Sequence, residues 1–240
     1  MTTEELYHEA RVRAGKGRHL EVLKILEILI KDRGERPNLA MYTALLHSYT
    51  SAPWGTAGKI RKALEDMEIA GVEPDARACE CALEALAVHP DSFLRTDILE
   101  YMKERWWTLS PRAEGFVVAG LLRERCFEQA MEMLEGMKDN ARVDGWVWDK
   151  AIWILLEFGE VEEAFHVLNL KQSVNPNVDT LLSDTLWLRL LDVAAHKHMV
   201  SIRDHPERIY FRFLKHALTQ VERRRQHDLV QPGLPRIPQA

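Results

Sequence analysis

A helix-pair pattern returns about every 35 residues along this chain. Met67, Met102 and Met137 hold the same place in it and lie 35 residues apart (102 − 67 = 137 − 102 = 35). A fixed period of this size indicates stacked helical hairpins rather than one globular domain. Such proteins present a long groove instead of a catalytic pocket. The pattern is plainest in 63–75 (ALEDMEIAGVEPD), 95–109 (RTDILEYMKERWWTL) and 130–144 (AMEMLEGMKDNARVD).

Composition limits how the chain can meet a charged partner. The net charge is −5, and residues 37–202 hold 16 basic and 26 acidic side chains. This excess of acid opposes bulk attraction of nucleic acid, so a phosphate contact must use local basic positions. No apolar run approaches the roughly 18 residues of a transmembrane helix, and we expect no membrane span.

Helical periodicity and exit turns predict an all-α fold with five hairpins over residues 1–179. The turns GERPN (34–38) and GVEPD (71–75) combine a glycine suited to a helix end with a proline that cannot continue the helix. Residues 180–227 are predicted to form further helices, as a degenerate repeat or a cap. The proline-rich residues 228–240 read as a disordered tail.

The ends and the aromatic residues raise two questions of packing. Leu6, Tyr7 and Ala10 of the first helix would have no covering neighbour, so we expect the chain to self-associate or to be unstable alone. Of the pair Trp106-Trp107, we expect one ring to pack and the other to be exposed for a partner. Other aromatic residues recur where hairpins would meet, and we interpret them as core between repeats, with a base-stacking platform as the alternative: Tyr42, Phe116, Trp146, Trp148, Trp153 and Trp187.

Nothing in the sequence indicates an enzyme, a cofactor or a metal site. Cys79 and Cys81 lie two apart on a predicted helix and point to different faces, as packing thiols would. His196 and His198 diverge in the same way, and no further ligand joins them. The sequence has no nucleophile elbow, phosphate-binding glycine loop or zinc-binding spacing.

The segment from Tyr42 to Asp75 reads Y-T-A-L-L … A-L-E-D-M-E-I-A-G-V-E-P-D. It closely resembles the pentatricopeptide repeat, Y-N-x-L-I … A-L-x-L-F-x-E-M-x-x-x-G-x-x-P-D, and the resemblance extends over about residues 4–198. The stretch 109–171 looks like the degenerate repeats of fungal mitochondrial members. The family implies a right-handed α-solenoid that binds single-stranded RNA in an organelle.

In this family the fifth residue of the first helix and the last residue of the repeat read one base. The resemblance assigns Thr43 and Asp75 to the second repeat, a pair that favours guanine. The first repeat presents His8 and Asn38, an unusual pair. The later pairs depart from the family pattern; they are Glu80 with Ser110, Gly115 with Asp144, and Asp149 with Asp179. An acid at the fifth position would repel phosphate.

A basic run near the C-terminus offers candidate phosphate contacts, with a solvated helix end as the alternative. It comprises Arg208, Arg212, Lys215, Arg223, Arg224 and Arg225. The resemblance implies a mitochondrial protein of post-transcriptional gene expression, acting in mRNA stability, processing or translational activation. The N-terminus holds Glu4, Glu5 and Glu9 and is not a convincing presequence. The acidic middle favours a protein-interaction scaffold of the same fold as the alternative.

Overall fold

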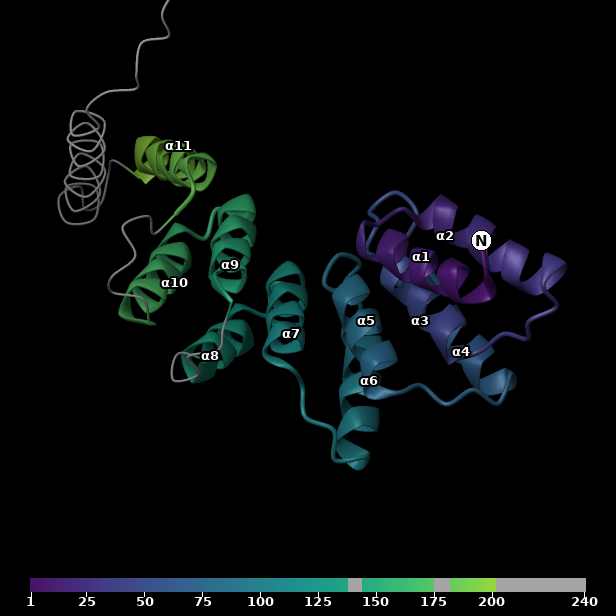
Figure 1. Cartoon of the computed structure of the whole chain (residues 1–240). Helices are drawn as coiled ribbons and strands as arrows, with labels where there is room; N and C mark the ends of the chain where they lie inside the picture. The colour runs from purple at the N-terminus through teal and green to yellow at the C-terminus, as the bar shows by residue number, and fades with distance from the viewer. Residues whose placement is uncertain (138–143, 175–181, 202–240) are drawn as a thin grey trace, which may run out of the picture. The chain divides into compact units, whose positions relative to one another are not determined.

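The computed structural model describes residues 1–137, 144–174 and 182–201 (Figure 1). The predicted further helices beyond residue 201, the tail over 228–240 and the basic run lie outside the described residues. The chain divides into two units, Met1–Arg189 and Leu190–Ala240, and the packing described below is that of the first unit.

The described residues form helices and contain no strand. Their bounds are α1 (Thr3–Gly15), α2 (His19–Glu27), the π-helical turn η1 (Ile28–Asp32), α3 (Leu39–Ser48), α4 (Ala57–Ile69), α5 (Ala76–Leu86), α6 (Ser92–Glu104), α7 (Pro111–Arg123), α8 (Phe127–Met137), α9 (Gly145–Phe158), α10 (Val161–Val174) and α11 (Asp184–Ser201). None of these described helices has the length and hydropathy needed to cross a membrane.

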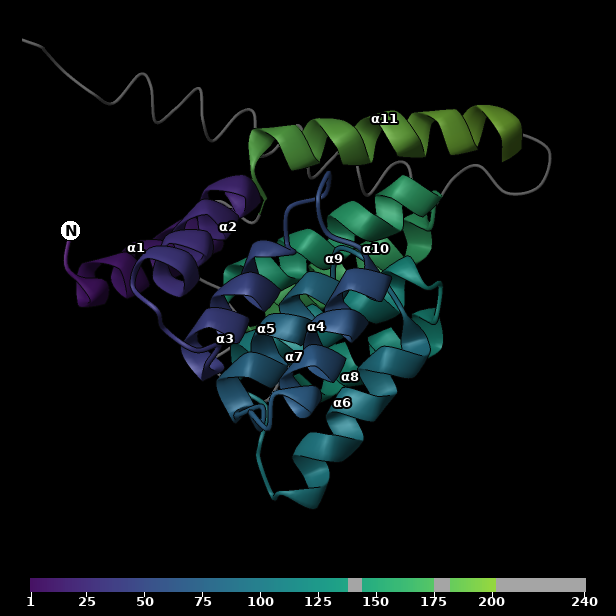
Figure 2. The ribbon, with the colours of Figure 1, turned by 90° about the vertical axis from the view of Figure 1, so that its right-hand side faces the viewer.

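Consecutive helices pair into hairpins, and the hairpins stack through their first helices. The pairs are α1 with α2, α3 with α4, α5 with α6, α7 with α8, and α9 with α10 (Figure 1). The first helices α1, α3, α5, α7 and α9 each contact the next in the series. Figure 2 looks along this row, so that α3, α5 and α7 lie one behind another. The prediction of an all-α solenoid of stacked helix-turn-helix repeats is confirmed.

Side-chain caps start most of these helices where the sequence has a short polar residue. Thr2 and Glu5 form a reciprocal capping box at α1. Asp75 accepts a hydrogen bond from the Ala78 amide at the start of α5, and Ser110 does the same for α7, which has Pro111 at its first position. These caps satisfy amides that the helix itself leaves without acceptors. Such caps therefore define where the first four hairpins begin, at α1, α3, α5 and α7, whereas α9 starts without a side-chain cap.

The first hairpin has its own core. Leu6 and Ala10 are buried and cluster with residues of α2 and α3, while Tyr7 is half-buried against the same cluster. The expectation that these three side chains lack cover is therefore wrong. The reason is geometric, because α3 as well as α2 packs on α1 and closes the face that the sequence leaves open.

The aromatic residues divide between the core and partly or fully exposed positions. Trp148 is fully buried. Trp146 and Phe116 are half-buried, with ring centroids 5.2 Å apart, and link α9 to α7. Trp107 packs edge-on against Tyr101 of its own hairpin, whereas Trp106 is 92% exposed. Only part of this set is interior core.

Left-handed residues end several helices. Four are glycines at φ between 66° and 76°, which are Gly17, Gly34, Gly71 and Gly159. The other two are Trp106 (φ 59°) after α6 and Arg125 (φ 61°) after α7. An L side chain in this conformation is strained, and glycine is the usual residue there. Arg125 lies 4.9 Å from the ring of Phe158, but the exposed ring of Trp106 has little packing to offset its strain.

We predict that Trp106→Gly raises the free energy of unfolding by about 1 kcal/mol, because it removes backbone strain at little cost in packing. The reciprocal change Gly71→Ala should lower it by a similar amount, since the added methyl group meets no atom within 4 Å and tests the backbone alone. Urea denaturation of both variants measures the difference. An unchanged midpoint for both would contradict the strain argument.

Candidate functional site

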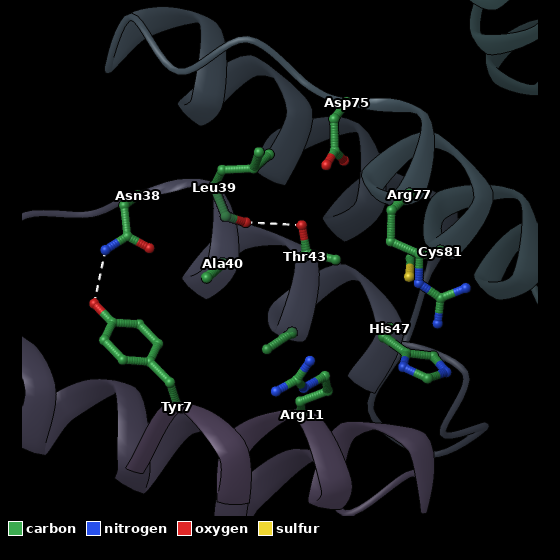
Figure 3. A pocket seen from close by; sticks show the side chains of 11 residues that line it. Tyr7, Arg11, Asn38, Leu39, Ala40, Thr43, His47, Asp75, Arg77 and Cys81 are labelled. Carbon is green, nitrogen blue, oxygen red and sulfur yellow. Dashed lines mark hydrogen bonds between the residues drawn. The ribbon is translucent and has the colours of Figure 1, made fainter. Parts of the chain in front are cut away.

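A groove of about 680 Å³ lies where α1, α3 and α5 meet (Figure 3). We call it the inner groove. It is lined by Tyr7, Arg11, Asn38, Leu39, Ala40, Thr43, Ala44, His47, Asp75, Arg77 and Cys81. It forms because the first helices pack side by side and their corresponding faces line one surface.

The inner groove brings together three of the four predicted base-reading residues. Thr43 lines it from α3, and Asn38 and Asp75 line it from the starts of α3 and α5. His8 is exposed on α1 and does not line the groove. The predicted phosphate contacts at Arg208, Arg212, Lys215, Arg223, Arg224 and Arg225 lie outside the described residues.

The Thr43 hydroxyl is partly engaged within its own helix. Thr43 Oγ1 donates to the carbonyl oxygen of Leu39 at 2.7 Å (Figure 3). The hydroxyl oxygen keeps lone pairs that can accept a hydrogen bond from a ligand. Since Thr43 is half-buried at the groove wall, an N–H donor placed in the groove could reach it.

Asp75 caps a helix and still has acceptor capacity. Its Oδ1 accepts a hydrogen bond from the Ala78 amide at 2.7 Å. Within the described residues its Oδ2 has no hydrogen-bond partner. An ionised carboxylate has several acceptor positions, so capping leaves the second oxygen available to a ligand. One residue can thus serve both the helix start and the groove.

Asn38 is more fully committed. Its Oδ1 accepts from the Met41 amide at 3.2 Å, and its Nδ2 donates to the Tyr7 hydroxyl at 2.7 Å (Figure 3). These two bonds join the start of α3 to α1. The amide plane is therefore held by its own chain and has less freedom to adapt to a ligand than Asp75.

Sequence reasoning missed the basic side chains of the inner groove. Arg11 is exposed, and no ion pair holds it in the described part of the chain. Arg77 lies 3.8 Å from a carboxylate oxygen of Glu80 and is itself 55% exposed. A signal was present, because Arg77 and Arg112 both stand second in a first helix, 35 residues apart (112 − 77 = 35). This periodic spacing would have found Arg77 but not Arg11.

In the third and fourth repeats, the positions that correspond to Thr43 and Asp75 are closed by contacts within the chain. Glu80 Oε1 accepts from the Ser110 amide at 3.1 Å, so the two members of the third pair bind each other. Gly115 is covered, since an added Cβ would lie 2.6 Å from Val147 and 3.1 Å from the Trp146 ring. These positions offer a ligand much less than Thr43 and Asp75 do.

Two acids on the first helices are paired with basic side chains. Asp149 lies 2.6 Å from Lys171 Nζ, and this ion pair offsets the repulsion of phosphate expected of an acid at the fifth position. Burial opposes ionisation of Glu84, but hydrogen bonds and charges from His47 and Arg112, each 3.3 Å away, outweigh it and lower its pKa. Paired acids of this kind repel phosphate much less than free ones.

The described residues contain no cluster of three or more His, Cys, Asp or Glu side chains arranged to hold a metal ion. Cys81 lines the inner groove from α5 but is buried. Burial raises its pKa to about 12 and that of Cys79 to about 11, so both thiols stay protonated near neutral pH. Neither can act as a ready nucleophile, because the thiolate is the reactive form.

No family model matches the sequence, and no curated protein is significantly similar to it. The structure is similar to the crystal structure of the pentatricopeptide repeat protein PPR10 from maize, with a TM-score of 0.58 and 18% identity. That match covers 91% of this chain and 28% of PPR10, so the chain spans less than a third of the length of the protein it matches. A structure of PPR10 in complex with an 18-nt psaJ RNA element matches with a TM-score of 0.46 and 16% identity, over 97% of this chain and 40% of that one. The fold is that of a pentatricopeptide repeat array.

Alkylation of the folded protein near neutral pH should label Cys126, which is half-buried, well before Cys79 and Cys81. Fewer than about one in a thousand of the two buried thiols are ionised at pH 7.5, and burial also keeps the reagent out. Peptide mapping by mass spectrometry measures the three rates. In denaturant the three should react at similar rates, and rapid labelling of Cys81 in the folded protein would show that α5 separates from its neighbours.

Proposed function

We propose that this chain binds single-stranded RNA through the inner groove. The observation that carries the proposal is the meeting of Thr43 and Asp75 in one groove with Arg11 and Arg77. The first pair offers hydrogen-bond acceptors, and the second pair offers positive charge. An unpaired nucleotide presents the matching groups, with N–H donors on its base and a negative phosphate.

The groups left free in the groove favour a base that donates. Asp75 has a free carboxylate oxygen, and the Thr43 hydroxyl oxygen can accept a further bond. Guanine carries N–H donors on its Watson–Crick edge that a carboxylate can accept. This agrees with the preference for guanine that the pentatricopeptide resemblance implies for this pair. Uracil, cytosine and adenine each carry a single N–H donor group on that edge, whereas guanine carries two side by side, so they satisfy the carboxylate less fully.

The number of bases read in this way is small. Asn38 is held by Tyr7 and by the start of α3, and the pair of Glu80 and Ser110 is closed on itself. We therefore propose one selective base contact, supported by phosphate contacts along the row. The expected affinity is modest and depends strongly on salt, because ionic contacts supply most of it.

The biological setting is proposed from the family resemblance alone. We propose a role in mitochondrial post-transcriptional gene expression, in mRNA stability, processing or translational activation. Fractionation of cells that express the full chain tests the compartment. Recovery outside mitochondria would remove this part of the proposal and leave RNA binding untouched.

Selection from a pool of short single-stranded RNAs near physiological salt should enrich guanine at one position. The double variant Thr43→Val/Asp75→Asn should weaken binding to the enriched RNA about tenfold, since it removes one hydroxyl and one carboxylate while asparagine still caps α5. Fluorescence anisotropy at two salt concentrations measures both proteins.

The matched control is Thr96→Val/Asp91→Asn on α6. Thr96 also donates to a carbonyl one turn earlier, and Asp91 also caps its helix, but neither lines the inner groove. This control should bind RNA like the parent protein. If the parent loses all binding at the higher salt, or if both double variants behave alike, the scaffold function becomes the better account.

Arg11→Gln should reduce RNA binding without changing the preferred base. Loss of a phosphate contact lowers affinity evenly across RNA sequences. It also reduces the slope of log K against log salt by about 1. Titrations at several salt concentrations give the slope. Lys24→Gln, on α2 away from the inner groove, serves as the charge control. An equal slope for all three proteins would exclude Arg11 from phosphate binding.

A further inference from the structure

A second groove, of about 610 Å³, lies between the second helices α4 and α6. We call it the outer groove. Both helices pack against α5, which separates the two grooves, with Cys79 lining the outer groove and Cys81 the inner one. The outer groove is lined by Arg61, Leu64, Glu65, Glu68, Gly71, Val72, Glu73, Pro74, Cys79, Leu94, Asp97, Ile98, Tyr101 and Arg105.

The outer groove runs along the two helices. On α4 its lining follows the spacing i, i+3, i+4, i+7 from Arg61 to Glu68, and on α6 it follows the same spacing from Leu94 to Tyr101 and continues to Arg105. From Leu94 to Arg105 the lining covers eleven helical steps, a rise of about 16 Å or about three turns. The groove therefore has the length that suits one more helix lying in it.

The unpaired charge around the outer groove is negative. Glu65, Glu68 and Glu73 are exposed, and no ion pair holds them in the described part of the chain. Of the two basic residues of the lining, Arg61 is paired, at 3.4 Å from Asp91 and 4.0 Å from Asp97. The Arg105 guanidinium lies 3.5 Å over the Tyr101 ring and keeps its positive charge, so three unpaired glutamates stand against one arginine. The charge left for a partner favours a cation and opposes RNA.

Apolar surface accompanies this charge. Leu64, Val72 and Tyr101 are half-buried in the lining. Ile69 and Trp106, at 85% and 92% exposed, stand at the C-terminal ends of the two helices that form the groove. Trp106 also has a left-handed backbone conformation, which in the turns at 34–38 and 71–75 belongs to Gly34 and Gly71. A large ring kept exposed at a strained position suits a contact with another molecule.

We propose that the outer groove binds a basic amphipathic helix of a partner protein. About three turns of that helix would lie between α4 and α6, with apolar side chains toward Leu64 and Tyr101 and with lysine or arginine beside Glu65, Glu68 and Glu73. Trp106 would pack against the end of the bound helix. This surface is separate from the inner groove, so a partner and RNA can bind together.

The test uses the full chain and a synthetic helical peptide of leucine and lysine, about 14 residues long, with leucine at helical spacing. One control peptide has the same composition in scrambled order, and another has glutamate in place of lysine. Fluorescence anisotropy should show the patterned basic peptide binding at least about tenfold more tightly than either control. Equal binding of the patterned and scrambled peptides would overturn the proposal.

Charge reversal locates the peptide on the protein. Glu65→Lys/Glu68→Lys should weaken binding at least about tenfold, whereas Glu128→Lys/Glu132→Lys, the same charge change at exposed positions of α8, should alter it less than about twofold. Trp106→Gly should weaken binding while the protein stays folded, as circular dichroism and the melting temperature would show. Equal loss in both charge-reversed proteins would mean nonspecific attraction and would overturn the proposal.

Two other occupants are distinguished in the same experiment. Self-association in sedimentation that Glu65→Lys/Glu68→Lys abolishes would assign the outer groove to a second copy of the chain. Loss of peptide binding in Thr43→Val/Asp75→Asn, which changes the inner groove alone, would place the peptide in the inner groove. Either result would overturn the proposal, and peptide binding that this variant leaves unchanged supports it.

Discussion

The contact between successive first helices is the constraint on which the rest of this structure depends. No single hairpin can bury its own apolar face, so α1 is completed by α3, α3 by α5, and so on to α9. This row places equivalent residues of successive repeats on one surface. It also leaves the second helices further apart, and the outer groove between α4 and α6 is a consequence. Both candidate binding surfaces thus follow from how the hairpins hide their apolar faces.

The last residue of each of the first three repeats must satisfy two physical demands. Asn38, Asp75 and Ser110 each accept the hydrogen bond that starts the next first helix. Short polar residues are the preferred caps, so their presence at these positions needs no ligand to explain it. Base reading can use only the atoms that capping leaves free. Asp75 meets that condition, because one of its carboxylate oxygens stays free to accept a hydrogen bond. Asn38 does not, because its side-chain nitrogen already donates a hydrogen bond to the Tyr7 hydroxyl.

Much of the fold could be predicted from the sequence because its signals are local. The 35-residue period, the glycine-proline exits and the capping residues each act within a few positions and predicted the helical array. The resemblance to the pentatricopeptide repeat singled out the pair Thr43 and Asp75, and both side chains line the inner groove. The contributions of Arg11, His47 and Arg77 were missed, since no local rule says which helical face meets the next repeat.

The sequence by itself determined the helices, their order and the residue types at each repeated position, because hydrophobic period, capping and turn chemistry are local. Only the tertiary structure decided which of those positions stay open. Lys171 neutralises Asp149 across 22 residues, the Ser110 amide binds Glu80 across 30, and α3 covers a face of α1 that had seemed exposed. These pairings depend on how whole helices lie against one another, and a side chain's neighbours along the chain do not determine its neighbours in space.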